Sequence, residues 1–451
     1  MTTKNKTRLK PEPLLRVGII LPEDRVQKID LVVPGGAEFI FDDAPAIKKS
    51  TMQCMDVAIK QGDKELLSVR IGKDPEIQVS SVKICQPEQR CHPGGDSIQV
   101  RNVVAGRNFH WKKHVDVNLP GDVEVRITDR SLILINTLLF EYYVACVATS
   151  EMSAACPAEF IMAQTVAARS WMLANVEKKH LAMGMDVCND DCCQRYQGMK
   201  HLTAQSLEGA KRTAGQVLMH GDKICDARYS KSCGGVIESF EGTWEGGSVE
   251  YLIAKPDTED ANSLPDLTTD HNFAMFMNQT SEAFCGPKYI DESSLKKYLG
   301  HVDEGGAYFR WDLVLKQDEL ITNLAEKCGI AVKAVQDLVP LKRGRSGRIL
   351  QLKVIYQSVS GELSEIILRS EYAIRESLHA NFLYSSAFHI EKACRSEEAP
   401  AYFSLRGGGW GHGVGLCQIG ALGMAMHGYK MAEILVHYFP NTHLEKVWHA
   451  F

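Results

Sequence analysis

The sequence predicts an α+β protein with several domains, and three observations favour this fold class. The chain has 451 residues, which exceeds the size of one compact core. Residues 16–127 contain short runs with alternating apolar and polar residues, separated by Gly, Pro and Asp turns, as in strands. Residues 141–175 are apolar, rich in alanine and periodic like helices. We expect a β-rich N-terminal domain at 1–125, a helical core with a mixed sheet at 126–255, and an α+β C-terminal domain with an insertion and a glycine-rich loop at 256–451.

The segment Glu141–Asn175 predicts two helices with a short break. Its first run, Tyr142–Ser150, is apolar on nearly all sides. The break ends at Pro157, which suits the first turn of a helix because the missing N–H group is not needed there. Apolar and small residues then recur at helical spacing to about Glu177.

Glu151 ends the first apolar run, where a carboxylate is costly to bury. A carboxyl group in such surroundings has a raised pKa, as a general acid requires near neutral pH. Arg169 follows eighteen residues later and could reach back to Glu151 or hold a substrate anion. The alternative is that Glu151 caps the second helix and Arg169 is a charge on the helix surface.

Composition excludes some classes of function. The formal net charge of −5 argues against a nucleic-acid partner, since such proteins usually carry basic excess. The sequence contains no apolar run long enough for a transmembrane segment. Residues 1–24 start basic but turn to a strand pattern at Arg16, so we expect no clear signal peptide. The 14 cysteines are scattered, unlike a secreted disulfide scaffold, and most are expected to be buried or reduced thiols.

Three cysteines lie within six residues, with a histidine upstream, and thiolates with an imidazole are a ligand set that suits zinc. The candidate ligands are His180, Cys188, Cys192 and Cys193, with His201 as the substitute for His180. The alternative is a cysteine-rich loop without metal, or thiols that oxidise. Cys85 and Cys91–His92 resemble half a zinc site, but no second pair follows, so a loop with free cysteines is expected there.

The most specific stretch is Arg406–Ala421, in which glycines leave few side chains besides Trp410, His412, Cys417 and Gln418. Such a loop brings backbone N–H groups and an imidazole close to a ligand. It lacks the Gly-Lys-Ser/Thr ending of a phosphate loop and the βαβ context of a dinucleotide site.

These motifs resemble the SpoIID/LytB family, which comprises stage II sporulation protein D and the amidase enhancers. The resemblance is carried by Glu151-Met152, by Ala163-Gln164 and Ala167-Ala168-Arg169, and by the glycine-rich loop with its following Gln and Gly-Ala. Weaker matches are the cysteine cluster, the loop Tyr229–Gly235 and the aromatic segment 108–111. The chain departs from the family at Cys192, where zinc-binding members have His, and at Cys417, where Ser is usual.

The resemblance implies a peptidoglycan lytic transglycosylase, which cleaves the link between N-acetylmuramic acid and N-acetylglucosamine. Glu151 would be its acid and base, with Arg169 in a supporting role. The cysteine cluster would hold structural zinc. Hydroxyl, ammonium, aromatic and amide groups would contact the glycan, namely those of Tyr229, Lys231, Ser232, Trp410, His412 and Gln418. The loop at Tyr229–Gly235 could equally be a hairpin turn that needs only its glycines.

Two other functions stay open. One is a non-catalytic module that binds glycan strands and activates a cell-wall amidase, which would not need Glu151. The other is a cytosolic zinc protein of unrelated role, favoured by the cysteines and the missing signal peptide. The family implies the cell envelope as the location.

Overall fold

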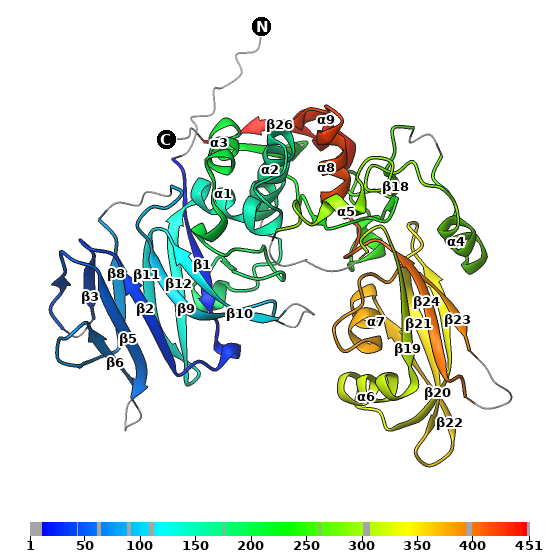
Figure 1. Ribbon diagram of the computed structural model, residues 1–451, viewed down its shortest axis with the longest axis horizontal. Helices are drawn as coiled ribbons and strands as arrows, with labels where there is room; N and C mark the ends of the chain where they lie inside the picture. The colour runs from blue at the N-terminus through cyan, green and yellow to red at the C-terminus, as the bar shows by residue number, and fades with distance from the viewer. Residues whose placement is uncertain are drawn as a thin grey trace, which may run out of the picture.

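The computed structural model describes residues 11–42, 44–60, 65–87, 92–107, 112–174, 176–260, 263–300, 307–393 and 399–448. It is a mixed α+β protein with several sheets, which confirms the predicted fold class. Figure 1 shows strands of the N-terminal part on one side, helices in the middle and a second α+β lobe on the other side. Cys91 of the expected free-cysteine loop and the aromatic segment 108–111 lie outside the described residues.

Two antiparallel sheets with one parallel edge pairing form the N-terminal part, and their facing apolar side chains make its core. One sheet has the order β13-β1-β12-β11-β8-β3-β4, and the other β10-β9-β2-β5-β6-β7. In β2, for example, Ile29, Leu31 and Val33 are buried and the residues between them are not, as alternation requires. The strands are β1 (Leu14–Ile20), β2 (Lys28–Val33), β3 (Glu38–Phe41), β4 (Ile47–Lys48), β5 (Gln53–Lys60), β6 (Leu66–Ile71), β7 (Ile77–Val79), β8 (Ser81–Cys85), β9 (Ile98–Ala105), β10 (Lys113–Leu119), β11 (Asp122–Thr128), β12 (Ser131–Leu139) and β13 (Val187–Cys188).

The two predicted central helices are confirmed as α1 (Phe140–Glu151) and α2 (Ala158–Ala174). Helix α1 follows β12 without a loop and is buried almost along its whole length. Helix α3 (Ala204–Arg212) packs against both. Because small residues fill α2, neighbouring helices approach it closely.

The end of the chain returns to this helical core. Helices α8 (Gln418–Met426) and α9 (Met431–Tyr438) pack against α2, and β26 (His443–Lys446) pairs with β14. The apolar pattern of residues 424–438 would suit one continuous helix, but Gly428, at φ 92°, breaks the segment into two. The short strands of this region are β14 (Gln216–His220), β15 (Lys223–Ile224), β16 (Tyr229–Ser230), β17 (Val236–Ile237), β18 (Lys255–Pro256) and β25 (Leu416–Cys417).

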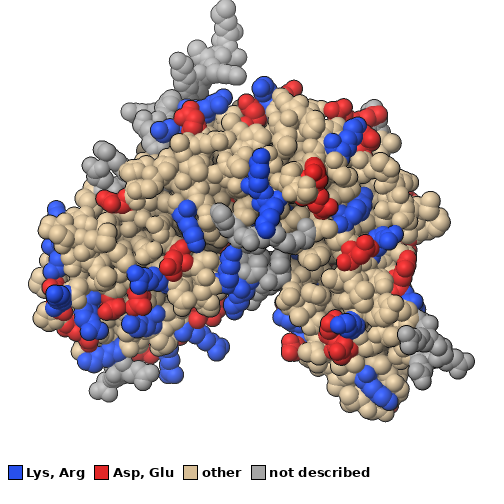
Figure 2. All heavy atoms as spheres, viewed as in Figure 1, with Lys and Arg blue, Asp and Glu red and all other residues tan. Residues whose placement is uncertain are grey.

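The second lobe combines two three-stranded sheets with α6 and α7, around a core of its own. Helix α6 spans Gln317–Cys328 and helix α7 spans Glu371–Leu378. Figure 2 shows a hollow between this lobe and the N-terminal sheets. The helices and strands between residues 270 and 408 are α4 (Asp270–Met277), α5 (Glu292–Leu295), β19 (Arg310–Lys316), α6 (Gln317–Cys328), β20 (Val332–Arg343), β21 (Ile349–Ser358), β22 (Leu363–Arg369), α7 (Glu371–Leu378), β23 (Phe388–Lys392) and β24 (Tyr402–Gly408). Of these, α5 packs in the central core and not in the second lobe.

A third apolar core lies between the other two and draws residues from both the expected middle and last domains. Ala148 and Phe160 of the helices pack there with Leu422 of α8 and Phe439 after α9. The domain boundaries at 126 and 256 stay a prediction. Within the described residues, we find no helix with the length and apolar character that crossing a membrane demands.

Candidate active site

Glu151 is the last residue of α1 and is only 7% exposed. Its Oε1 accepts hydrogen bonds from the backbone N–H of Arg195 at 3.1 Å and from the Tyr229 hydroxyl at 3.0 Å. The Gln418 amide lies 3.4 Å from Oε2. Burial raises the pKa of the Glu151 carboxyl, against the opposing charges of Arg195 and Lys231. This carboxyl therefore keeps its proton to a higher pH than an exposed glutamate does.

Glu151 lies in the wall of a cavity of about 660 Å³. That volume is within the range of small-molecule sites. All three parts of the molecule contribute to the wall, from Arg107 near the N-terminal sheets to Phe382 after α7. Its aromatic side chains, which suit contact with sugar rings, are Trp171, Tyr229, Trp244, Tyr372, Phe382 and Trp410.

Other acidic side chains in the cavity wall differ from Glu151 in their partners. Four of them form ion pairs with arginines, and the remaining one, Glu23, is exposed. The pairs are Asp190–Arg107 (3.3 Å), Asp191–Arg195 (2.7 Å), Glu177–Arg228 (2.8 Å) and Glu371–Arg375 (3.1 Å). An arginine partner favours the ionised carboxylate. The hydrogen bonds to the Glu151 carboxyl come instead from an amide N–H, a phenol and a carboxamide, none of which is charged.

Strand pairing brings the other predicted contacts to Glu151. Strands β16 and β25 run parallel, so that Tyr229 pairs with Leu416 beside Gln418. The Lys231 ammonium donates to the carbonyl oxygen of Glu151 at 2.9 Å, at the end of α1. Two segments that are distant in sequence thus deliver their polar groups to the same carboxyl.

The four predicted metal ligands lie together. The ligand atoms of His180, Cys188, Cys192 and Cys193 are all within 4.8 Å of one another. The Sγ atoms of Cys188 and Cys192 are 3.1 Å apart, and His180 Nε2 lies 4.0 Å from Cys192 Sγ. His201 bonds to Gln197 and is not part of this cluster. Three thiols and an imidazole gathered within this distance form a donor set that could hold a metal ion.

The cysteine segment also supports Glu151. Arg195 follows the cluster directly, and its side chain is held by Asp191 at 2.7 and 3.0 Å. The backbone N–H of Gln197 donates to Ser150 Oγ at 3.1 Å. The segment is therefore fastened along the end of α1, with the Arg195 N–H directed at Glu151.

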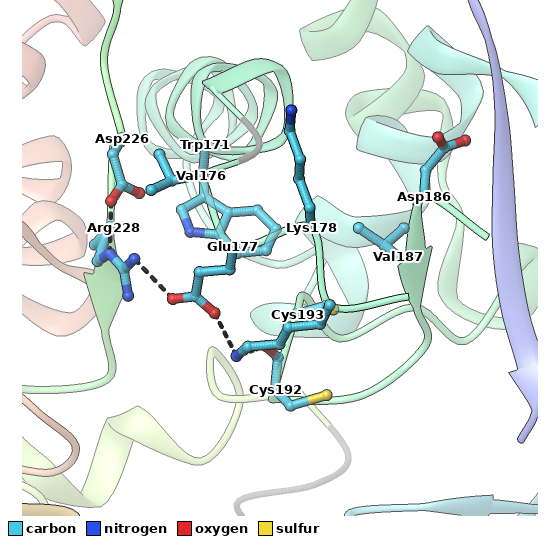
Figure 3. A pocket seen from close by; sticks show the side chains of 11 residues that line it. Trp171, Val176, Glu177, Lys178, Asp186, Val187, Cys192, Cys193, Asp226 and Arg228 are labelled. Carbon is cyan, nitrogen blue, oxygen red and sulfur yellow. Dashed lines mark hydrogen bonds and ion pairs between the residues drawn. The ribbon is translucent and has the colours of Figure 1, made fainter. Parts of the chain in front are cut away.

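A small recess of about 20 Å³ adjoins the cavity (Figure 3) and has room for about one water molecule. In it, Arg228 lies between Asp226 at 2.9 Å and Glu177 at 2.8 Å. The guanidinium group also lies 3.8 Å from the ring centroid of Trp244. This network stabilises the cavity wall, and the recess is too small for a sugar.

Two regions of the chain match known protein families. Residues 128–220 match the family described as "Stage II sporulation protein", and residues 238–415 match "Domain of unknown function (DUF8618)". The chain contains a SpoIID domain. Glu151 and the four candidate metal ligands all lie within it.

Two curated proteins are similar over much of the chain. An amidase enhancer of Bacillus subtilis (strain 168) is 26% identical over 307 residues, which are 65% of this chain and 39% of that protein. An uncharacterized protein of Brachyspira hyodysenteriae (strain ATCC 49526 / WA1) is 25% identical over 319 residues, 68% of this chain and 67% of that protein. The chain is thus a distant homologue of the amidase enhancer and matches well under half of its length.

Beyond the SpoIID domain, the glycine-rich loop supplies Trp410 to the cavity wall. The ring stacks on Tyr384 at a centroid distance of 4.3 Å and lies 4.7 Å from the Tyr308 ring. Trp410 is 7% exposed. Little of this ring is left to stack on a sugar, so its main contacts are within the protein.

His412 also lines the cavity. Its Nδ1 accepts from the backbone N–H of Val414 at 3.0 Å, which leaves the ring proton on Nε2. Burial lowers the pKa of His412 well below its ordinary value, and nearby arginines, first Arg228, act in the same direction. The imidazole is therefore neutral, which does not favour a role for His412 as a proton carrier.

The glycines of this loop serve close packing more than ligand binding. A Cβ at Gly413 would meet the Arg348 guanidinium at 2.3 Å. Backbone N–H groups that the sequence suggested for a ligand are used internally, for example Trp410 to the Ser232 carbonyl and Gly411 to the Tyr384 carbonyl.

The role expected of Arg169 needs correction. Arg169 is fully buried and does not line the cavity. Its guanidinium group bonds to Glu141 at 3.0 and 2.5 Å and to the Gln216 carbonyl at 3.0 Å. Because these contacts fix it away from Glu151, it cannot hold a substrate anion. The alternative, a helix-surface charge, is equally wrong.

The position of Ser232 also differs from the one that its predicted role requires. Its side chain is fully buried and is absent from the cavity wall that Tyr229 and Lys231 line. A sugar in the cavity therefore cannot contact the Ser232 hydroxyl.

Proposed function

We propose that the protein is a peptidoglycan lytic transglycosylase with Glu151 as its acid and base. Protonated Glu151 gives its proton to the glycosidic oxygen, and the bond from that oxygen to C1 of N-acetylmuramic acid breaks. The resulting carboxylate takes the proton of the 6-hydroxyl group, whose oxygen bonds to C1 and closes the anhydro ring. The reaction consumes no water molecule, because the 6-hydroxyl group is the nucleophile.

One observation carries the proposal: Glu151 has neutral hydrogen-bond donors, whereas the other non-exposed acids of the described cavity wall have arginines. Glycosidases that use water usually place two carboxyl groups across the bond. A carboxyl that can change its protonation state and has no arginine partner fits the transglycosylase scheme. Oε1 already accepts two hydrogen bonds, so Oε2 is the oxygen that would carry the proton.

The remaining groups would position the glycan and the carboxyl. Lys231 fixes the end of α1 through the Glu151 carbonyl, and Tyr229 and Gln418 orient the two carboxyl oxygens. The His412 ring, which also bonds to the Tyr229 backbone, would shape the cavity wall beside the glycan. The Trp410 ring would form part of the edge of the cavity.

The cluster of His180, Cys188, Cys192 and Cys193 would hold structural zinc. Zinc would neutralise the thiolates there. With four protein ligands, the site would leave no position for a reactive water, so the cluster's role is to fix the segment that directs the Arg195 N–H at Glu151.

Peptidoglycan glycan strands, with and without stem peptides, provide the test. We would incubate them with wild type, Glu151→Gln and Glu208→Gln, a matched change on the exposed side of α3, and detect anhydro ends by mass spectrometry. We expect products from wild type and Glu208→Gln and none from Glu151→Gln, with glycan binding retained in all. Turnover by Glu151→Gln would remove Glu151 from the mechanism.

Similarity to an amidase enhancer favours a second candidate, a non-catalytic module that binds glycan and activates a cell-wall amidase. It predicts no anhydro ends from any variant, with binding intact in wild type and Glu151→Gln. In that case, stimulation of an amidase by both proteins to the same extent would support the enhancer function.

A further inference from the structure

A second group of metal-ligating side chains lies outside the cavity wall. The ligand atoms of Cys233, Asp257, Cys285 and Cys417 are all within 4.8 Å of one another. Each of these residues is at most 3% exposed. The position of Cys417 is one at which the chain departs from its family resemblance, since Ser is usual there.

Four separate segments build this group. Cys233 lies in the loop after β16, and Asp257 directly follows β18. Cys285 lies between α4 and α5, and Cys417 is the N-cap residue of α8. The four ligands come from segments that are distant in sequence, and all of them are buried. A single local turn therefore does not explain why they lie together.

The measured spacing fits a tetrahedral ion. Around zinc, two thiolates are about 3.8 Å apart, and a thiolate and a carboxylate oxygen about 3.5 Å, given bond lengths of about 2.3 and 2.0 Å. Here the Sγ atoms of Cys233 and Cys285 are 3.6 Å apart, and Cys233 Sγ lies 3.2 Å from Asp257 Oδ2.

The surroundings of the group suit bound thiolates. Backbone N–H groups point at sulfur, from Gly235 to Cys233 Sγ at 3.4 Å and from Gly420 to Cys417 Sγ at 3.3 Å. A third, from Cys233 itself, reaches Cys417 Sγ at 3.2 Å. Such donors orient metal ligands and offset their charge.

The two carboxylate oxygens of Asp257 face different groups. Oδ1 accepts from the Tyr438 hydroxyl at 2.8 Å and faces His437 Nε2 at 3.2 Å. Oδ2 faces Cys233. A fully buried carboxylate with one oxygen directed at thiols needs a cation nearby to remain ionised.

We propose that Cys233, Asp257, Cys285 and Cys417 form a second, structural zinc site. It supplies four protein ligands and therefore leaves no open position for water. Cys233 is two residues from Lys231, and Cys417 directly precedes Gln418. The ion fixes the two segments that place these side chains at Glu151.

Metal analysis of the full chain, purified without chelator, tests this site. Wild type is expected to contain two zinc ions per chain, and Cys285→Ala one. Cys188→Ala, which leaves the second site intact, is expected to keep one. A wild type with a single zinc that Cys188→Ala removes would overturn the proposal, even if Cys285→Ala fails to fold.

Thiol counting separates the metal site from a disulfide between Cys233 and Cys285. Denatured wild type, treated with chelator but no reductant, should show all 14 thiols. A count of 12 that rises to 14 with reductant, and that does not fall in Cys285→Ala, would mean that these two cysteines are oxidised and would overturn the proposal. Cobalt loading of Cys188→Ala should produce thiolate-to-cobalt absorption, and its absence would contradict the site.

Discussion

Helix α1 carries one buried glutamate at each end, and their surroundings differ. Glu141, in the first turn, is fully buried and accepts from Arg169, from the Gly215 N–H at 2.9 Å and from the Trp448 indole at 3.0 Å. Glu151, in the last turn, faces a cavity and accepts from neutral groups. Burial alone therefore does not make an acid catalyst. The charge of its partner and its access to a substrate decide between a structural and a chemical role.

The largest effect on stability is expected from Glu141→Gln. The change leaves Arg169 buried without its counter-ion, and breaking such a pair costs about 3–5 kcal/mol. Urea denaturation should show this loss, while Glu208→Gln, an exposed matched change, should stay within about 0.5 kcal/mol of wild type. A Glu141→Gln variant as stable as wild type would show that the pair is not what holds α1 to α2.

A smaller effect, on the reaction rate, is expected from Tyr229→Phe, which removes one hydrogen-bond donor to Glu151 Oε1. Hydrogen bonds to charged groups contribute about 1.5–3 kcal/mol, so the rate of anhydro-end formation should fall about tenfold or more. Losing a donor to the carboxylate raises the pKa of Glu151 further, so the pH profile should move to higher pH. An unchanged rate and profile would contradict the assigned contact.

The smallest effect concerns the pH dependence of stability. Burial raises the pKa of Glu151 in the folded state. The stability linked to its proton is therefore fully present below the unfolded pKa and is lost as the pH rises through the folded pKa. The Glu151→Gln side chain does not titrate. As the pH rises, the melting temperature of this variant should therefore increase relative to that of wild type, by an amount that corresponds to about 1 kcal/mol of stability. A constant difference across pH 4–8 would contradict the raised pKa.

Local patterns explain what could be predicted from the sequence. Helices α1 and α2 were predictable because their apolar periodicity is continuous, and Glu151 because it interrupts an apolar run. The first cysteine cluster was predictable because its three cysteines lie within one short segment.

Non-local contacts explain what could not be predicted from the sequence. The pairing of Arg169 with Glu141 depends on how α2 crosses α1, and the stacking of Trp410 depends on the placement of Tyr384 in another lobe. The second cysteine group combines residues as distant as Cys233 and Cys417. The part played by Arg195 was also not predictable, because it acts through its backbone N–H, which every residue except proline has.

The central claim, that Glu151 is held as a proton donor, can be measured by NMR on protein labelled with ¹³C at the glutamate carboxyls. Titration of wild type should show a Glu151 carboxyl resonance with a pKa above the ordinary glutamate range. That resonance should be absent from Glu151→Gln and present in Glu208→Gln, whereas the resonance of Glu12, whose pKa burial also raises, should remain in both variants. If Glu151→Gln loses no resonance with a raised pKa, the account of this site is wrong.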